Sequence, residues 1–317
     1  MKQDEERVQI CRDIMLGPLL GEGGMGRIYE GFESGLGSHA AIKVLREELL
    51  EEKEVRSRFD EESLLMASIE HPGCLPIYGW GVDDKGRPFY AMRKISGRTL
   101  TELLDERGDQ IKSLVWRRRL LSIFQSVCET MGYAHEQGIV HRDLKPDNVM
   151  IDEFGSVYVI DWGIAKRASE KEGTKASRTL TGAVMGSPGY MSPEQADGRT
   201  AKAGPESDVF ALGVILYEIL TGKSPFRGET EKEAMAHAVN LDPTPPGLSL
   251  LVGRSLRALC MKTLHKEPRQ RYRSAHALAE DIRSYNEGGR IKIVKPSVGE
   301  RIIFSMRRDP VRAGLTF

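Results

Sequence analysis

The chain has 317 residues, of which 40% are hydrophobic, so it has room for two lobes and a sizeable core. Its 46 Lys and Arg residues balance 46 Asp and Glu residues, and the net charge therefore favours neither nucleic acid nor an acidic substrate as a partner. The cysteines contain no C-x-x-C pair, which argues against a disulfide or zinc framework; they are Cys11, Cys74, Cys128 and Cys260.

Targeting signals are not visible in the sequence. Residues 1–12 are charged and lack the apolar stretch of a signal peptide. The longest apolar stretch, residues 209–220, contains Glu218 and is shorter than the about 20 residues that span a bilayer. We therefore expect a buried helix there and a cytoplasmic location.

A glycine-rich segment comes first in chain order. Its G-x-G-x-x-G spacing lets backbone N–H groups approach phosphates without a Cβ clash. The pattern alone also fits dinucleotide-binding folds and ordinary turns, but in a dinucleotide site the glycines lead into a helix, whereas Ile28 and Tyr29 have strand character. The segment expected to bind a nucleotide consists of Leu20, Gly21, Glu22, Gly23, Gly24, Met25, Gly26, Arg27 and Ile28.

A second short strand, residues 40–44, places Lys43 between apolar neighbours. One interpretation is an ammonium that binds the α- and β-phosphates of ATP, and the other is a solubilising lysine on an edge strand. Its position soon after the glycine-rich segment favours the first interpretation.

Residues 46–70 have helical character, because apolar residues recur there at near-helical spacing. Most of the glutamates in this segment must be solvated surface. Glu62 lies on the apolar side, one turn before Met66, so we expect it rather than Glu61 to pair with Lys43. A shift of one residue would turn the carboxylate to another face.

The most informative segment reads H-R-D-L-K-P-D-N over residues 141–148 and is followed by D-W-G from Asp161. Asp143 can accept a hydroxyl proton, and Lys145 is a cation two positions later. Asn148 and Asp161 offer oxygen ligands of the kind that Mg²⁺ binds. Phosphoryl transfer needs such positioning and positive charge more than it needs covalent chemistry.

These segments together resemble those of the eukaryotic-type (Hanks-type) protein kinases, and most of all the bacterial membrane-associated Ser/Thr kinases. The resemblance covers residues 14–285 and implies an α+β, bilobal protein kinase fold, with a small β-rich N-lobe carrying one main helix and a larger, mainly α-helical C-lobe. The implied segments are an N-terminal extension (1–13), the N-lobe (14–92), the hinge (93–95), the C-lobe (96–285) and a basic tail (286–317).

The resemblance also implies a role for individual residues around the nucleotide. Glu62 lies nine residues before His71, as the ion-pairing glutamate does in this family. Met92 takes the gatekeeper position, and Ala41 and Lys94 join it at the nucleotide. The Arg93-Lys94 pair replaces the acidic residue that is more usual there, which leaves nucleotide selectivity less defined.

Downstream, the sequence G-S-P-G-Y-M-S-P-E over residues 186–194 resembles the end of a kinase activation loop. Ser187 keeps a hydroxyl that could bridge the catalytic aspartate and lysine. Glu194 needs a buried cation, and Arg271 matches by order and spacing. Asp208 resembles the aspartate that anchors the catalytic loop from the central helix.

The implied activity is that of an ATP- and Mg²⁺-dependent protein serine/threonine kinase, with Mn²⁺ as an alternative cation. Its partners would be proteins with Ser or Thr hydroxyls and a second copy of itself in trans-autophosphorylation, but not nucleic acid. Three alternatives stay open: a pseudokinase or scaffold that binds nucleotide without efficient transfer, a small-molecule phosphotransferase of related fold, and an interaction module. The phosphotransferase would not be expected to have Lys145 or Arg271.

Regulation is expected in the activation loop, where Thr179 and Thr181 form a T-x-T pair. A phosphate on either residue could pair with Arg142 and order the loop. The other interpretation is a polar loop in which threonines have no special role. A basic run at residues 116–119 is expected to be a solvated helix face.

The tail is the least kinase-like part of the chain. Residues 289–317 contain seven basic residues against two acidic ones, with apolar residues that could form one helical face. Such a stretch can bind an anionic membrane surface, as a juxtamembrane segment of a cytoplasmic domain whose membrane-anchored parent chain continues past Phe317. A helix that docks back on the kinase is an equal alternative.

Overall fold

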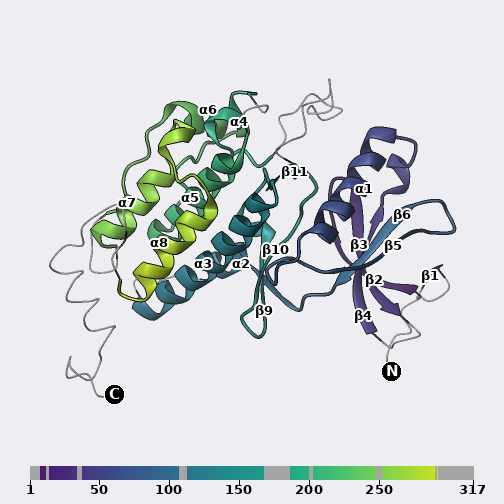
Figure 1. Ribbon diagram of the computed structural model, residues 1–317. Helices are drawn as coiled ribbons and strands as arrows, with labels where there is room; N and C mark the ends of the chain where they lie inside the picture. The colour runs from purple at the N-terminus through teal and green to yellow at the C-terminus, as the bar shows by residue number, and fades with distance from the viewer. Residues whose placement is uncertain are drawn as a thin grey trace, which may run out of the picture. The chain divides into compact units, whose positions relative to one another are not determined.

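The computed structural model describes residues 8–11, 14–33, 38–106, 113–167, 186–199, 203–247, 252–289 and 291. The chain falls into two compact units. The first contains residues up to 97 together with 150–165, and the second contains residues 98–149 together with those from 166 onward. A sheet dominates the first unit and helices dominate the second (Figure 1).

The first unit is built on a six-stranded antiparallel sheet with the strand order β1-β2-β3-β4-β6-β5 (Figure 1). β1 lies in the segment that we expected to be an N-terminal extension, and it pairs Val8 with Leu16 at one edge of the sheet. The strands are β1 (Val8–Cys11), β2 (Ile14–Glu22), β3 (Gly26–Glu33), β4 (Ser38–Leu45), β5 (Ile77–Val82) and β6 (Pro88–Arg93).

The central strand β4 is buried on both faces of the sheet. Ile42 and Val44 point to one face, where they pack in an apolar cluster with residues of β2 and β6. Because side chains alternate along a strand, Lys43 points to the opposite face. Its cross-strand partner there is Tyr90 of β6.

Helix α1 (Lys53–Ser68) covers the face of the sheet that carries the lysine. Its buried residues include Phe59, Glu62 and Met66, which recur at helical spacing. The ring of Phe59 lies 5.3 Å from the ring of Tyr90, centroid to centroid. Truncation of a buried aromatic ring typically costs about 3–5 kcal/mol, so this contact fixes α1 on the sheet and brings Glu62 with it.

Two further sheets are short. One has the strand order β10-β9-β7, and the other pairs β8 with β11 in antiparallel fashion. Their strands are β7 (Gly97–Thr99), β8 (Ile139–Val140), β9 (Val149–Asp152), β10 (Val157–Val159) and β11 (Lys166–Arg167).

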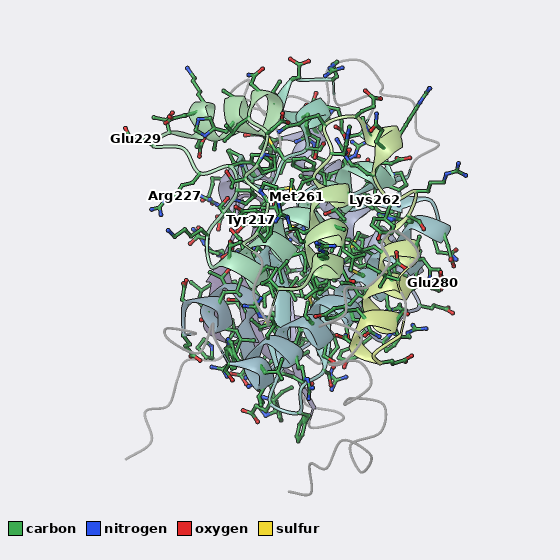
Figure 2. All side chains as sticks on the ribbon, turned by 90° about the vertical axis from the view of Figure 1, so that its left-hand side faces the viewer. Tyr217, Arg227, Glu229, Met261, Lys262 and Glu280 are labelled. Carbon is green, nitrogen blue, oxygen red and sulfur yellow. The ribbon has the colours of Figure 1, made fainter. Side chains whose placement is uncertain are left out.

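The second unit is mainly helical, and α3 contacts both α5 and α8, while α5 also contacts α7. Figure 2 views its side chains, including Tyr217 of α5, Lys262 of α7 and Glu280 of α8. The helices are α2 (Leu100–Asp105), α3 (Leu114–Glu136), α4 (Pro193–Ala196), α5 (Pro205–Thr221), α6 (Glu231–Asn240), α7 (Arg254–Thr263) and α8 (Ala275–Asn286). Short 3₁₀ helices in the chain are η1 (Glu47–Leu49), η3 (Pro146–Asn148) and η5 (Pro268–Gln270).

Helix α5 confirms the buried helix predicted for residues 209–220. It starts with Pro205 and ends at Thr221, and the next residue, Gly222, has a φ of 81° that favours glycine and stops the helix. Among the described residues, no helix is long and apolar enough to cross a membrane. An antiparallel sheet with α1, followed by a largely helical region, confirms the predicted α+β class.

The basic run at residues 116–119 was expected to be a solvated helix face, and this prediction was wrong for Arg117. That side chain is buried, whereas Arg118 and Arg119 are exposed. Helical spacing explains the difference, because position 117 lies on the same face as the buried Leu120 and Leu121. Burial lowers the pKa of Arg117.

Candidate active site

A buried ion pair joins β4 to α1 in the first unit. Lys43 Nζ donates to both carboxylate oxygens of Glu62, at 2.6 Å to Oε1 and 2.9 Å to Oε2. Glu61, the alternative partner, instead accepts a hydrogen bond from Ser57 at the surface. Burial alone would lower the pKa of Lys43, but the charges of Glu62 and Asp161 offset it and the pKa lies above its ordinary value. The lysine therefore remains a cation in the interior.

A tyrosine completes this pair. The hydroxyl of Tyr90 donates to Glu62 Oε1 at 2.8 Å, and the residue is 1% exposed. Burial and the nearby carboxylate of Glu62 raise the pKa of Tyr90 well above its ordinary value, so the hydroxyl keeps its proton and acts as a donor.

The D-W-G segment lies against the same carboxylate. A Cβ at Gly163 would lie 3.1 Å from Met25 Cε, 3.2 Å from Asp161 Oδ1 and 3.3 Å from Glu62 Oε2. Asp161 has a φ of 61°, a left-handed conformation that a non-glycine residue seldom adopts. Trp162 is buried beside it and donates its indole N–H to the carbonyl of Val159 at 3.2 Å.

The glycine-rich segment forms the end of β2, a tight turn and the start of β3. Its turn is closed by the hydrogen bond from Gly23 N to Gly26 O at 2.9 Å. A Cβ at Gly26 would lie 3.0 Å from the carbonyl oxygen of Val44 and 3.2 Å from Lys43 Cγ, so the turn reaches the lysine only because this residue is glycine. At the surface, Arg27 pairs with Glu22 at 3.3 Å.

The predicted hinge residues have their own partners. Met92 is buried at the end of β6, opposite Ala41 in register. Lys94 Nζ lies 2.7 Å from Glu30 Oε1, and its hydrogen bond is the main reason why the pKa of Glu30 is lowered. The guanidinium of Arg93 lies over the ring of Tyr158, 5.6 Å from its centroid. A role for Lys94 at the nucleotide stays a prediction.

The second unit holds a cluster around Asp143. Ser187 contacts both Asp143 and Lys145, the two residues that it was predicted to bridge, but it uses two different groups. Its backbone N donates to Asp143 Oδ1 at 2.8 Å, and its hydroxyl accepts from Lys145 Nζ at 2.7 Å. Lys145 Nζ also lies 3.2 Å from Asp143 Oδ2. The side-chain amide of Asn148 donates to the backbone carbonyl of Asp143 at 2.8 Å. The carboxylate is thus held in one orientation by a cation and a backbone N–H.

Asp208 of α5 anchors the backbone of residues 141 and 142. Its carboxylate accepts from the backbone N of His141 at 2.8 Å and of Arg142 at 2.9 Å, and His135 Nε2 lies 2.9 Å from it. Burial alone would raise the pKa of Asp208, but the hydrogen bond and charge of His135 offset it, and the pKa is lowered. Arg142 has a φ of 70°, so this anchor holds a backbone conformation that is otherwise unfavourable.

The predicted pair of Glu194 and Arg271 is present and buried. The guanidinium donates to both carboxylate oxygens, at 2.8 Å and 2.9 Å, and Ser207 Oγ donates to the same carboxylate at 2.6 Å. Burial alone would raise the pKa of Glu194, but Arg271 offsets this effect and the pKa is lowered. The segment that ends at α4 is therefore fixed to the helical core.

The comparison with known families decides the identity of the fold. The protein kinase domain matches residues 15–282 of the chain. The chain belongs to the protein kinase family.

Similar curated proteins are bacterial serine/threonine kinases. The kinase domain is 35% identical to the serine/threonine-protein kinase PknB of Mycolicibacterium smegmatis over 277 residues, which are 86% of this chain and 43% of that protein. It is 32% identical to a probable serine/threonine-protein kinase of Corynebacterium efficiens, over 92% of this chain and 45% of that protein. It is 34% identical to the serine/threonine-protein kinase PknD of Protochlamydia amoebophila, over 85% of this chain and 29% of that protein. The chain thus spans less than half the length of these relatives.

Several predicted features of the kinase domain lie outside the described residues. Thr179 and Thr181 fall there, as does nearly all of the basic tail. Within the described part of the chain, no cluster of three or more His, Cys, Asp or Glu residues could hold a metal ion. The predicted metal ligands, Asn148 and Asp161, include only one such residue.

Sequence reasoning missed several residues that hold the site of the kinase domain. Gln195 donates its side-chain amide to the carbonyl of Arg142 at 2.8 Å. The S-P-E-Q sequence from Ser192 is a capping-box pattern, so this residue could have been found. Tyr90 and His135 carry no such local signal, because their partners lie 28 and 73 positions away along the chain.

Proposed function

We propose that this kinase domain transfers the γ-phosphate of ATP to Ser and Thr hydroxyls of proteins, with Mg²⁺ as cofactor. The observation that carries the proposal is the buried ion pair between Lys43 and Glu62. A buried ion pair adds little net stability compared with apolar residues of similar volume. A cation kept inside the sheet is better explained by a need for positive charge at a phosphate than by folding.

The cluster around Asp143 supplies the acceptor side of the reaction. With Oδ1 bound by a backbone N–H and Oδ2 beside Lys145, the aspartate can orient a substrate hydroxyl and accept its proton as the phosphoryl group is transferred. Lys145 Nζ lies 3.2 Å from the oxygen that would accept the proton, so its positive charge could stabilise the phosphoryl group as it is transferred to the hydroxyl. Ser187 limits the motion of both side chains.

The residues proposed for Mg²⁺ fit this cation in their chemistry. Asn148 has its amide N–H₂ engaged with the carbonyl of Asp143, so the amide oxygen is the atom left to face a metal. Asp161 presents an exposed carboxylate. Mg²⁺ usually takes one or two protein oxygens and completes its shell with water and phosphates, so an amide oxygen or a single carboxylate is a suitable ligand. When bound, the ion would neutralise phosphate charge; Mn²⁺ has the same ligand preference.

Incubation of the chain with labelled ATP, Mg²⁺ and a Ser/Thr peptide tests the proposal. We expect transfer, and a fall in kcat of about 100-fold or more for Asp143→Asn, because a general base typically contributes 10²- to 10⁴-fold. Lys43→Met should lower kcat/KM by a similar factor. Lys85→Met and Asp84→Asn, at exposed positions of the first unit, are matched controls. Binding of Mg-ATP without transfer by the wild type would favour the pseudokinase instead.

Autophosphorylation in trans at Thr179 and Thr181 is a finer part of the proposal. Arg142 supports it, since its backbone is held at N by Asp208 and at O by Gln195. A phosphothreonine adds about −1.5 to −2 charges and could pair with that arginine. Mapping of phosphopeptides after ATP treatment, in wild type and in Asp143→Asn, tests it; an active enzyme without loop phosphate would contradict it.

We also propose that the basic tail binds anionic membranes. The excess of basic residues over acidic ones supports this, since each Lys or Arg near an anionic surface contributes about 1 kcal/mol. The full chain should sediment with vesicles of anionic lipid, whereas a chain cut after residue 288 should stay in the supernatant. Sedimentation of neither would favour a tail that docks on the kinase domain, and equal sedimentation of both would show that the tail is not what binds the vesicles.

A further inference from the structure

The carboxylate of Glu62 is held by two strands rather than one. Lys43 of β4 contacts both of its oxygens, and Tyr90 of β6 donates to Oε1. The two residues are direct cross-strand partners, and the tyrosine ring also lies 5.8 Å from Lys43 Nζ and 5.3 Å from the ring of Phe59. Tyr90 therefore touches the helix, the glutamate and the lysine at once.

We propose that Tyr90 is a positioning residue that holds Glu62, and with it α1, in the orientation that Lys43 requires for phosphate binding. This inference rests on the proposed kinase activity. The reason is that Lys43 has to serve both Glu62 and a phosphate. An ammonium has only three N–H groups, and each one that donates to a phosphate can no longer donate to Glu62. A second donor on a different strand keeps the carboxylate in place during that exchange.

The tyrosine suits this role because its hydroxyl is neutral and fixed. A neutral hydroxyl donates a hydrogen bond to the buried carboxylate but adds no positive charge, so Lys43 remains the cation that neutralises Glu62. Leaving that lone pair unsatisfied in the interior would be unfavourable, because a buried polar group loses its hydrogen bonds to water and, without a partner, gains none within the protein. The ring is immobilised by burial between β6 and α1, so its hydroxyl has little freedom to leave Glu62.

Tyr90→Phe is the direct test, since it removes one hydroxyl and keeps the ring. We expect kcat for peptide phosphorylation to fall about tenfold or more, because a hydrogen bond to a charged group is typically worth that factor, while the KM for ATP changes less than about twofold. Tyr78→Phe, which removes the hydroxyl of an exposed tyrosine on β5, should leave both constants unchanged. Thermal unfolding of both variants shows whether either loses its fold.

A double-mutant cycle separates positioning from general damage. In a Glu62→Gln background, Tyr90→Phe should reduce kcat by much less than in the wild type, because the partner of the hydroxyl has been changed. Equal reductions in the two backgrounds, or an unchanged kcat in Tyr90→Phe, would overturn the inference.

Amide hydrogen exchange tests the same contact without activity. Residues 53–68 of α1 should exchange faster in Tyr90→Phe than in Tyr78→Phe, and equal exchange would also overturn the inference. If the wild type transfers no phosphate, the proposed function fails, while the exchange experiment still decides whether Tyr90 holds α1.

Discussion

Two buried ion pairs, one in each unit, differ in how completely their donors are used. Arg271 uses all five of its N–H groups: two on Glu194 and three on the backbone carbonyls of His265, Glu206 and Lys266. Lys43 has three N–H groups, and its hydrogen bonds within the described residues go to one carboxylate.

The difference separates a structural pair from one with capacity for a ligand. A guanidinium whose N–H groups all have partners can only hold elements together, here η5, α5 and helix α4, which carries Glu194. An ammonium whose hydrogen bonds go to a single carboxylate can direct some of its N–H groups to a ligand such as a phosphate. We therefore expect substitutions at the Lys43–Glu62 pair to act on activity more than on folding. Substitutions at the Glu194–Arg271 pair should do the opposite.

Arg271→Ala should give the largest loss of stability. It leaves Glu194 buried without its cation, which typically costs 3–5 kcal/mol, and it also frees three backbone carbonyls. The free energy of unfolding in urea measures the loss. Arg269→Ala, two residues earlier and exposed on η5, is the control and should change stability by less than about 0.5 kcal/mol. Similar values for the two variants would remove the distinction between the pairs.

Asp208→Asn should follow, with a loss of about 2–3 kcal/mol. The NH2 group of asparagine replaces one carboxylate oxygen and cannot accept a hydrogen bond, so one of the two backbone N–H groups, of His141 or Arg142, loses its acceptor. A hydrogen bond to a charged group is worth about 1.5–3 kcal/mol. Urea unfolding gives the loss, and the phosphorylation assay should show a lower kcat. Asp242→Asn, at an exposed position before α7, is the control.

Acid should destabilise the second unit through the same carboxylates. The pKa values of Glu194 and Asp208 are lower in the folded chain than the values of about 4 in an unfolded one. Their contribution is therefore present above about pH 4 and is lost as the pH falls through the folded values. Urea midpoints measured from pH 6 to pH 3 should fall, and the fall should be smaller in Glu194→Gln with Arg271→Met. An equal fall of the urea midpoint in the wild type and in this variant would mean that groups other than Glu194 cause the sensitivity to acid.

Replacement of the Lys43–Glu62 pair by apolar residues should have the smallest effect on stability. Lys43→Met with Glu62→Leu and Tyr90→Phe removes both charges and the hydroxyl that donates to Glu62, so no buried polar group loses its partner. Such replacements of a buried pair are often neutral or stabilising. We expect unfolding free energy within about 1 kcal/mol of the wild type and no detectable phosphoryl transfer. A loss as large as that of Arg271→Ala would show that the pair is needed for folding.

The sequence predicted the parts of the site that depend on local spacing. The helical face of α1 distinguished Glu62 from Glu61, and the strand pattern of residues 40–44 identified Lys43 as a lone cation between apolar neighbours. The segments around Asp143 and Glu194 fall in order along the chain, so resemblance to a family could assign their partners. Roles at the nucleotide, the metal and the phosphosites stay predictions.

Residues whose contacts depend on the packing of distant elements were beyond that reasoning. Tyr90 looks like any aromatic residue of a strand until α1 packs on the sheet. Arg117 looks like surface because it is charged and has basic neighbours, yet its helical phase buries it. Strand β1 was missed because residues 8–11 are short and their pairing is set by β2, not by their own pattern.

Strand β1 has a practical consequence for solubility. The family match starts at residue 15, so a protein trimmed to that match would lack this strand. The outer edge of β2 would then present a row of unpaired N–H and C=O groups, which is a template for pairing with another chain. Aggregation of such a shortened protein would reflect an uncovered sheet edge rather than a failure of the kinase domain to fold.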